Sequence, residues 1–463
     1  MQRTLAIETP KFVGQEVKLQ GWVHNHRRLG KMVFIDLRDR TGLIQVLFMN
    51  ALAEPANQIR PEFVVEITGT VVERKGKGAN PNLPTGGVEI HASALNVLST
   101  AETPPFEINN EEKASNAGEE LRLEYRYLDL RRPTMRQRLV LRADINASLR
   151  NFLRSQEFVE VETPILTKGT PEGAREYIVP SRNFSGKFYV LPQSPQQFKQ
   201  LLMVGGVERY FQIARCFRDE DQRGDRQPEF TQLDIEMSFV DEEDLLTLAE
   251  KMITNLVKEV APEKHISQTP FPRLTYAEAM ATYNTDKPDL RKDKNDPNEL
   301  AFCFVTDFPL FEKSETEKKL VATHHLFTSP KDPEGFLAGT VKPEAAFGKQ
   351  YDIALNGFEI AGGSIRIHNS ALQQKVFDVL GIPKEEADMR FGHLLKAFSF
   401  GVPPHGGIAF GLDRLVAILA GVENIREVIA MPKTGDARDP LMGAPSALPK
   451  QQLDDAHIQI KKE

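Results

Sequence analysis

Hydrophobic and polar residues alternate along most of the first hundred positions, which is the period of β-strands with one buried face. Five stretches follow this pattern, at residues 17–28, 31–38, 43–49, 63–74 and 88–98. Asp39-Arg40-Thr41-Gly42 predicts a hairpin turn between the second and third strands, and an Ala/Pro segment over 50–58 separates the third from the fourth. We therefore expect an all-β domain over residues 1–104.

Five strands with a short helix after the third is the order of an OB barrel, a fold whose sheet commonly binds oligonucleotides. In the second strand Val33, Ile35 and Leu37 share one face, which leaves Phe34 on the other. A basic segment, His24-Asn25-His26-Arg27-Arg28, precedes this strand. An exposed aromatic ring beside cations is what base stacking requires; the alternative is that Phe34 packs under a loop as a minor core residue.

The pattern changes after the predicted barrel. Residues 105–135 are charged and lack strand alternation, and we interpret them as a hinge with short helices. From residue 136 to 463 helical and strand patterns are mixed, which predicts an α+β domain. Its first elements are a helix ending near Ser155 and a strand ending at Thr163-Pro164. A polar stretch broken by prolines, 285–300, predicts a surface linker.

A loop dense with charge lies between two predicted strands, 209–218 and 230–238. The intervening loop, 219–229, is too long for a tight hairpin. One face of the second strand bears polar and aromatic side chains, namely Phe230, Gln232, Asp234, Glu236 and Ser238. A charged loop on a rigid hairpin beside such a face is typical of a binding site.

Composition limits the class of protein. The chain has 463 residues and a net charge of −7, and 40% of its residues are hydrophobic, which predicts two or more globular domains. No run of about 18 apolar residues is present and the N-terminus has no apolar signal region, so we expect neither a membrane span nor a secretory leader. Cys216 and Cys303 are the only cysteines, which argues against a disulfide framework and indicates a cytoplasmic protein.

Three segments together resemble the class II aminoacyl-tRNA synthetases. Phe217-Arg218-Asp219-Glu220 fits the FRxE signature of motif 2 in that family, and Gly411-Leu412-Asp413-Arg414-Leu415 fits motif 3. The predicted helix and strand over 136–164 fit motif 1, the usual dimer element. The resemblance implies an antiparallel sheet flanked by helices in the second domain, and a homodimer formed through residues 136–164.

More specifically, the chain resembles the bacterial aspartyl-tRNA synthetases, in collinear order over nearly its whole length. The segments that support this are 170–175, 193–200, 226–234 and 362–368. The resemblance implies ATP-dependent attachment of L-aspartate to tRNA(Asp) through an aspartyl-adenylate, with Mg²⁺. One departure is that bacterial enzymes have a sizeable inserted domain between motifs 2 and 3, where this chain has only the 285–300 linker.

The residues expected to bind the amino acid begin with a predicted helix. Pro195 follows Ser194, a good N-cap, which predicts a helix over 195–204. Lys199 near its start is unfavourable for the helix dipole, which indicates an anionic ligand. By resemblance this ligand is the side-chain carboxylate of aspartate, held by Lys199 and Arg366, and arginine can bind a carboxylate bidentately. The resemblance also assigns to the amino acid Glu172, Gln196, Asp234 and His324.

The resemblance assigns catalysis to Arg218 on the α-phosphate and Arg414 on the γ-phosphate of ATP. An ionised carboxylate needs no strong base to attack, so catalysis is positioning plus charge stabilisation. Asp352 and Glu359 would hold Mg²⁺, which typically takes one or two protein carboxylates. The plainer alternative for Arg414 is a helix-terminal ion pair with Asp413. The full set assigned to ATP is Arg218, Asp219, Glu220, Gln227, Phe230, Glu359, Gly411, Leu412, Asp413 and Arg414.

Two features leave the local shape of this site open. Simple alternation puts Glu359 and Arg366 on opposite faces of a strand, whereas a bulge at Gly362-Gly363 would bring both inward. In addition, His324-His325 is followed by Leu326, where the family usually has proline, so an exposed histidine pair is the alternative to a substrate contact.

By the same resemblance, the barrel binds the tRNA anticodon through Arg27, Phe34, Gln45 and Glu89. Three alternatives stay open: a related enzyme specific for asparagine or lysine, a nucleic-acid-binding paralogue with an inert synthetase-like domain, and an enzyme that also charges tRNA(Asn). The inert paralogue would be expected to lack Arg218 or Arg414, and both are present. Leu29 stands where relaxed bacterial enzymes often have histidine, which favours strict use of tRNA(Asp).

Overall fold

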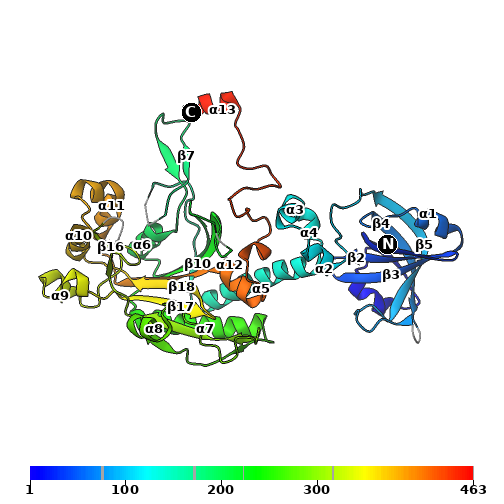
Figure 1. Cartoon of the computed structure of the whole chain (residues 1–463), viewed down its shortest axis with the longest axis horizontal. Helices are drawn as coiled ribbons and strands as arrows, with labels where there is room; N and C mark the ends of the chain where they lie inside the picture. Colours follow the sequence, from blue (N-terminus) through cyan, green and yellow to red (C-terminus); the bar gives the residue numbers. More distant parts are fainter. Residues whose placement is uncertain (75–77, 170–173, 223, 315–317, 462–463) are drawn as a thin grey trace. The chain divides into compact units, whose positions relative to one another are not determined.

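The computed structural model describes residues 1–74, 78–169, 174–222, 224–314 and 318–461. The chain divides into two compact units, Met1–Arg136 and Gln137–Glu463 (Figure 1). The division falls near the start of the long helix α5 (Pro133–Ser155). No described helix combines the length and the apolar character that a membrane crossing requires.

The first unit contains a closed barrel with the strand order β1-β2-β3-β5-β4. Its strands are β1 (Glu16–Leu29), β2 (Met32–Asp39), β3 (Gly42–Phe48), β4 (Val64–Glu73) and β5 (Val88–Ser99). The short helix after the third strand is present as η2 (Asn50–Leu52) and α1 (Ala53–Asn57), and η1 (Ala6–Phe12) precedes the barrel. Val33, Ile35 and Leu37 all lie in the barrel core, so the predicted OB barrel and its period of two are confirmed.

The predicted hinge forms three short helices, α2 (Glu111–Ser115), α3 (Glu119–Glu124) and α4 (Arg126–Asp129). The buried Asp129 carboxylate accepts hydrogen bonds from Arg126 at 2.6 Å and Arg132 at 2.8 Å. Arg131 donates to Glu62, next to the barrel strand β4, at 2.8 Å. These ion pairs hold α4 and the residues after it together and link this segment to the barrel within the first unit.

The second unit is built on an eight-stranded sheet with the order β12-β14-β17-β18-β19-β10-β9-β6. The strands are β6 (Val159–Glu160), β9 (Arg209–Phe217), β10 (Glu229–Ser238), β12 (Arg273–Thr275), β14 (Phe302–Thr306), β17 (Gln350–Leu355), β18 (Phe358–Ile365) and β19 (His405–Gly411). The edge pairs β12–β14 and β6–β9 are parallel, so the expected antiparallel sheet is a mixed one. The strands between them are antiparallel.

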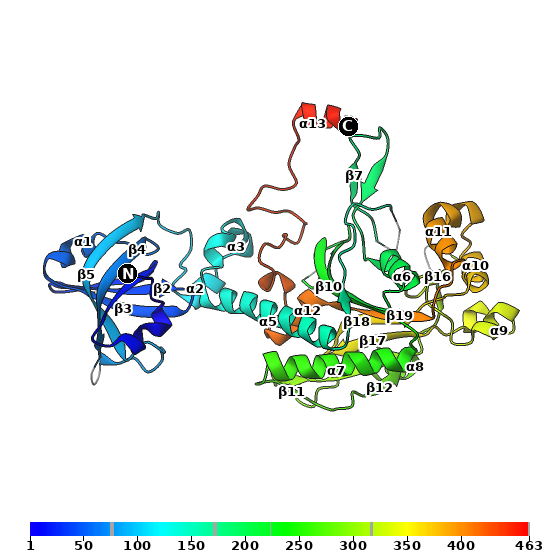
Figure 2. The same ribbon diagram turned by 180° about the vertical axis from the view of Figure 1, so that it is seen from behind.

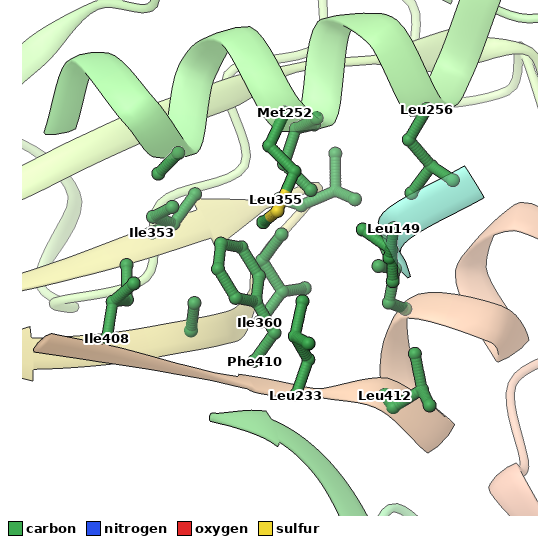
Figure 3. Close-up of a cluster of buried hydrophobic side chains, with 14 of the residues drawn as sticks. Leu149, Leu233, Met252, Leu256, Ile353, Leu355, Ile360, Ile408, Phe410 and Leu412 are labelled. Carbon is green, nitrogen blue, oxygen red and sulfur yellow. The ribbon is translucent and has the colours of Figure 1, made fainter. Parts of the chain in front are cut away.

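One face of this sheet forms the main core. Figure 2 shows α7 (Glu242–Val260) lying along the sheet. The core contains Met252 of α7, Leu233 and Ile408 from the strands, and Leu149 of α5 (Figure 3). Because side chains alternate along a strand, the neighbours of these residues point to the opposite face of the sheet.

The remaining elements of the second unit lie outside this eight-stranded sheet (Figure 1). They are the helices α6 (Gln196–Val204), α8 (Tyr276–Tyr283), α9 (Pro333–Ala338), η4 (Pro343–Ala345), α10 (Ser370–Val379), α11 (Lys384–Phe398), α12 (Leu412–Leu419), η5 (Ile425–Glu427) and α13 (Lys450–Asp455), and the strand pairs β7 (Ile178–Pro180) with β8 (Phe188–Val190), β11 (His265–Ile266) with β13 (Glu299–Leu300), and β15 (Phe311–Lys313) with β16 (Leu320–Ala322). α6 begins at Gln196, one residue later than predicted. The predicted strand that ends at Thr163-Pro164 is shortened to β6, since only Val159 and Glu160 pair with β9.

Candidate active site

The polar face of the sheet brings predicted site residues from distant parts of the sequence into register. Asp234 lies opposite Ala409, Ala409 opposite Gly362, and Gly362 opposite Asp352. The two inner residues of this row have small side chains, so the surface of the sheet between the two acids is open to a ligand. A side chain at the neighbouring Gly407 would collide with the Glu236 carboxylate, so that glycine is needed for close approach. The row therefore forms a shallow, polar site on the sheet.

A β-bulge explains how Glu359 joins this face. Ile353 lies opposite Ala361 and Ala354 opposite Glu359, which leaves Ile360 as the extra residue. Ile360 packs into the core, and the alternation shifts by one position, so Glu359 shares a face with Gly362. The bulge expected at Gly362-Gly363 is wrong in position, because both glycines pair regularly with β17.

Four buried charges form the centre of the site. Lys199 of α6 donates to Asp234 at 2.6 Å and lies 3.3 Å from Glu236. Arg366 donates from Nε and Nη2 to the two oxygens of Glu236, at 3.0 and 3.1 Å. Burial alone would raise the pKa of Glu236, but Arg366 and Lys199 lower it to about 2. Burial raises the pKa of Asp234 despite the nearby Lys199 ammonium.

Glu236 was not predicted as a functional residue from the sequence. It was predicted only to lie on the polar face of its strand, yet its carboxylate contacts both predicted carboxylate-binding cations. The signal was present in the alternation, because a glutamate two positions from Asp234 must point to the same face of the sheet. The predicted cations therefore already have acidic protein partners, two for Lys199 and one for Arg366.

Of the two adjacent histidines, His325 contacts the charged centre of the site. Nε2 of His325 lies 2.5 Å from Nη1 of Arg366, whereas His324 is exposed. Burial and the Arg366 guanidinium hold the pKa of His325 well below its usual range. Leu326 packs against two of the apolar clusters, so the replacement of the usual proline leaves this loop anchored. The contact predicted for His324 stays a prediction.

A hollow of about 270 Å³ lies beside this charge centre. The guanidinium of Arg218 lies 5.0 Å from the ring centre of Phe230, the cation–π arrangement that holds both side chains in place. Arg414, in the first turn of α12, donates to the backbone oxygen of Glu359 and lies 3.1 Å from Asp225. Both predicted phosphate ligands line the hollow, together with Glu220, Gln227, Phe230, Glu359, Gly411 and Asp413.

Two of the residues assigned to ATP are already engaged by protein groups. Asp413 accepts from the backbone N–H of Thr231 at 2.9 Å and from Arg142 at 2.5 Å. It therefore joins α5, β10 and α12, and the alternative of an Asp413–Arg414 ion pair is wrong. Gln227 exchanges two hydrogen bonds with the backbone of Lys433, at 2.7 and 3.1 Å.

Five polar atoms in the site are buried without a partner among the described residues. One is Oε1 of Gln222 in the lining of the hollow, and the other four are Nε of Arg218 and of Arg414, Oδ2 of Asp234 and Oδ1 of Asp352. Each of these four belongs to a residue that was predicted from the sequence to bind a ligand, and unpaired buried polar groups are costly. Their grouping on one face indicates that bound ligands complete these hydrogen bonds.

Asp352 and Glu359 converge as a divalent cation would require. A methyl group on Gly362 would lie 2.9 Å from Oδ1 of Asp352 and 3.7 Å from Oε1 of Glu359. Burial raises the pKa of Asp352 well above its usual range, and the Glu359 carboxylate adds to this. Two carboxylates fit Mg²⁺ carried by a nucleotide, whereas the described residues include no group of three or more metal-ligating side chains.

The remaining predicted residues lie outside the described part of the chain, at the rim of the site, in the core or on α6. Glu172 lies outside the described residues. Asp219 is bridged to Arg175 at the rim, and the Leu412 side chain packs into the core, so its backbone is what remains for a ligand. Gln196 is buried and donates to Gln200 at 3.1 Å.

On the barrel, the predicted anticodon residues share one outer face. Phe34 lies opposite Arg27 of β1, and Gln45 donates to Glu89 at 2.8 Å. Arg27 is largely exposed, at 60% of its side chain. Phe34 is half-buried and lies outside the barrel core cluster, which argues against the minor-core alternative.

The fold and this site define a class of protein. Residues 118–435 match the family described as tRNA synthetases class II (D, K and N), and residues 17–98 match an OB-fold nucleic acid binding domain. The first match covers more than half of the chain, which therefore belongs to the class II aminoacyl-tRNA synthetases.

Within this class the chain belongs to the aspartate–tRNA ligase family. It is 43% identical to the aspartate–tRNA(Asp/Asn) ligase of Rubrobacter xylanophilus, over 97% of this chain and 95% of the relative. It is 41% identical to the aspartate–tRNA ligase of Staphylococcus carnosus, over 98% of each. The alignments extend over 574 and 582 positions, more than the 463 residues of this chain, so the relatives contain residues without a counterpart here.

Solved structures show the same fold. The asparaginyl-tRNA synthetase of Pyrococcus horikoshii, complexed with asparaginyl-adenylate, matches with a TM-score of 0.75 and 23% identity, over 94% of this chain and 98% of the other. The aspartyl tRNA synthetase of Entamoeba histolytica matches with a TM-score of 0.72 and 25% identity, over 93% and 91%.

Proposed function

We propose that the protein activates L-aspartate with ATP and transfers it to tRNA(Asp) in the cytoplasm. The observation that supports this most strongly is the buried arrangement of Lys199 and Arg366 around Glu236, beside the hollow that contains Arg218 and Arg414. One half of the site suits an acidic amino acid and the other half suits phosphates. Residues 1–104 would bind the anticodon, 105–135 would act as the hinge, and 136–463 would perform the chemistry.

Selection of aspartate follows from the balance of charge. The site offers two acids and two cations, so the α-ammonium of the amino acid can pair with an acid while its side-chain carboxylate pairs with the cations. The α-ammonium would lie at the free Oδ2 of Asp234, and the side-chain carboxylate would accept from Lys199 and Arg366. The side-chain NH₂ of asparagine would instead place a hydrogen-bond donor opposite the donors of Lys199 and Arg366. Binding in a buried site is strongly disfavoured when two donors oppose each other.

Catalysis would rest on positioning and charge stabilisation. Arg218, stacked on Phe230, would hold the α-phosphate where the aspartate carboxylate attacks. Arg414, close to the N-terminus of α12, would hold the γ-phosphate beside free backbone N–H groups. Asp352 and Glu359 would hold Mg²⁺, which supplies positive charge to the phosphate oxygens when bound.

Within this function, the open question is whether the enzyme charges tRNA(Asp) alone or tRNA(Asn) as well. One relative is named for both tRNA(Asp) and tRNA(Asn), and another for aspartate–tRNA ligase alone. Leu29, exposed at the end of β1, supports strict use of tRNA(Asp). Charging of purified tRNA(Asp) and tRNA(Asn) with labelled aspartate tests the proposal. Charging of tRNA(Asp) alone is expected; equal charging of both would establish the broader activity, and charging of neither would refute the proposed function.

Phe34→Ala is expected to lower kcat/KM for charging of tRNA(Asp) about ten- to a hundredfold, since base stacking contributes roughly 1–3 kcal/mol. ATP–pyrophosphate exchange, which needs no tRNA, should stay within about twofold of wild type by the same reasoning. Leu98→Ala, at an exposed apolar residue on β5, is the matched control. Equal losses on full-length tRNA and on an acceptor minihelix would contradict an anticodon role for Phe34.

We also propose a homodimer through α5 and β6. Val159 on the edge strand is exposed, and so are Val140 on α5 and Ile165 and Leu166 just after β6. Exposed apolar residues grouped around an edge strand indicate an interface. Sedimentation at micromolar concentration should give a dimer for the wild type and for Leu337→Glu, an exposed control site on α9, but a monomer for Ile165→Glu. A monomeric wild type would contradict this proposal.

A further inference from the structure

A buried chain of side-chain hydrogen bonds runs from β19 to α6. Nδ1 of His405 lies 2.8 Å from the backbone oxygen of Pro403. A carbonyl oxygen can only accept, so Nδ1 of His405 must bear the proton. His405 is fully buried, and burial lowers the pKa of its ring below the usual value. The ring is therefore neutral near pH 7, and Nε2 is an acceptor.

The acceptor at Nε2 fixes the direction of the whole chain. Nε2 of Gln200 lies 3.1 Å from Nε2 of His405 and must donate to it. The amide of Gln200 then presents Oε1 on its other side, where Nε2 of Gln196 donates at 3.1 Å. Every polar atom of the Gln200 and His405 side chains is thus satisfied, although both residues are 0% exposed. We call this arrangement the Gln196–Gln200–His405 chain.

The free end of the chain is Oε1 of Gln196. No described residue donates a hydrogen bond to this atom, and it is not among the buried atoms that lack a partner. Gln196 lies one turn before Lys199, whose ammonium reaches Asp234. Oε1 of Gln196 therefore lies on the same part of α6 as Lys199, the residue proposed to bind the amino acid.

We propose that His405 and Gln200 are positioning residues that hold the amide of Gln196 with its oxygen toward the ammonium group of the substrate. This inference rests on the proposed function. An unrestrained glutamine amide can turn over, and the reversed amide would face an ammonium donor with its own NH₂ donor. A neutral His405 prevents this, because reversal of Gln196 would require reversal of Gln200 against a ring nitrogen that only accepts.

Two substitutions at Gln200 separate this role from simple packing. Gln200→Met keeps the length of the side chain but makes no hydrogen bond, so the Gln196 amide is released. Gln200→Glu still accepts from Gln196 and pairs with His405 once that ring takes up a proton, so the Gln196 amide keeps its direction. Gln200→Met is expected to raise KM for aspartate about tenfold, the scale of an oriented hydrogen bond to a charged group. Gln200→Glu should stay within about threefold of wild type.

The measurement is ATP–pyrophosphate exchange with varied aspartate and then varied ATP, alongside thermal unfolding. Positioning predicts that KM for aspartate changes while KM for ATP does not. Packing alone predicts the reverse order of variants, with the isosteric methionine tolerated and the buried glutamate worse, and this result would overturn the inference. If Gln200→Met does not fold, Gln200→Glu still decides: an unchanged KM supports the inference and a tenfold rise contradicts it. Absence of exchange in the wild type would instead overturn the proposed function.

Discussion

Arg218→Ala is expected to lower kcat for aspartate-dependent ATP–pyrophosphate exchange by about a hundred- to a thousandfold, as loss of one preorganised donor to a developing negative charge does in other enzymes. Arg218 lines the hollow beside Arg414, and its Nε is buried with no partner among the described residues. A buried donor without a hydrogen-bond partner lowers the stability of the fold, so we infer that a ligand accepts this hydrogen bond. The loss should therefore appear mainly in kcat.

The control is a second arginine on the same hairpin. Arg215 of β9 pairs with Glu229 at the exposed edge and does not line the hollow. Arg215→Ala should leave kcat within about twofold, since exposed ion pairs contribute little. Similar losses in both variants would mean that the hairpin is merely destabilised, and an active Arg218→Ala would contradict the assignment of the α-phosphate.

Lys199→Leu is expected to lower kcat/KM for aspartate by at least about a hundredfold, roughly 3 kcal/mol, with KM for ATP nearly unchanged. The ammonium of Lys199 lies within 3.3 Å of both Asp234 and Glu236, so its removal leaves excess buried negative charge where the substrate carboxylate must bind. Removing one partner of a buried ion pair also destabilises the fold by about 3–5 kcal/mol. Thermal unfolding is therefore measured on the same sample.

The matched control for Lys199→Leu is Lys396→Leu, at an exposed position on α11. It makes the same chemical change without removing a buried charge, and exchange should be unaffected. If Lys199→Leu is folded and its kcat/KM for aspartate equals that of wild type, the carboxylate-binding site is assigned wrongly.

The helices and strands that follow from the spacing of hydrophobic residues or from capping residues could be predicted from the sequence. The barrel strands follow from period-two alternation, which places Val33, Ile35 and Leu37 in the core. α6 could be recognised from Ser194 and Pro195, although it begins one residue later. These features need no information about distant parts of the chain.

Contacts between distant segments were not predictable in the same way. The extra residue at Ile360 reverses the alternation, and only the pairing of β17 with β18 reveals it. The bond from Arg142 to Asp413 joins residues 271 positions apart. Glu236 was on the correct face, but its contacts with Lys199 and Arg366 depend on where α6 and the residue after β18 lie relative to β10.

The most direct test of the account is ATP–pyrophosphate exchange by the purified wild-type protein with aspartate, asparagine and lysine supplied separately. Because Lys199 and Arg366 both donate hydrogen bonds, we expect exchange with aspartate. For asparagine, kcat/KM should be lower by at least about a hundredfold, because its side-chain NH₂ would place a buried donor opposite these donors. Lysine should support no exchange. Exchange with asparagine equal to or faster than exchange with aspartate would contradict the account.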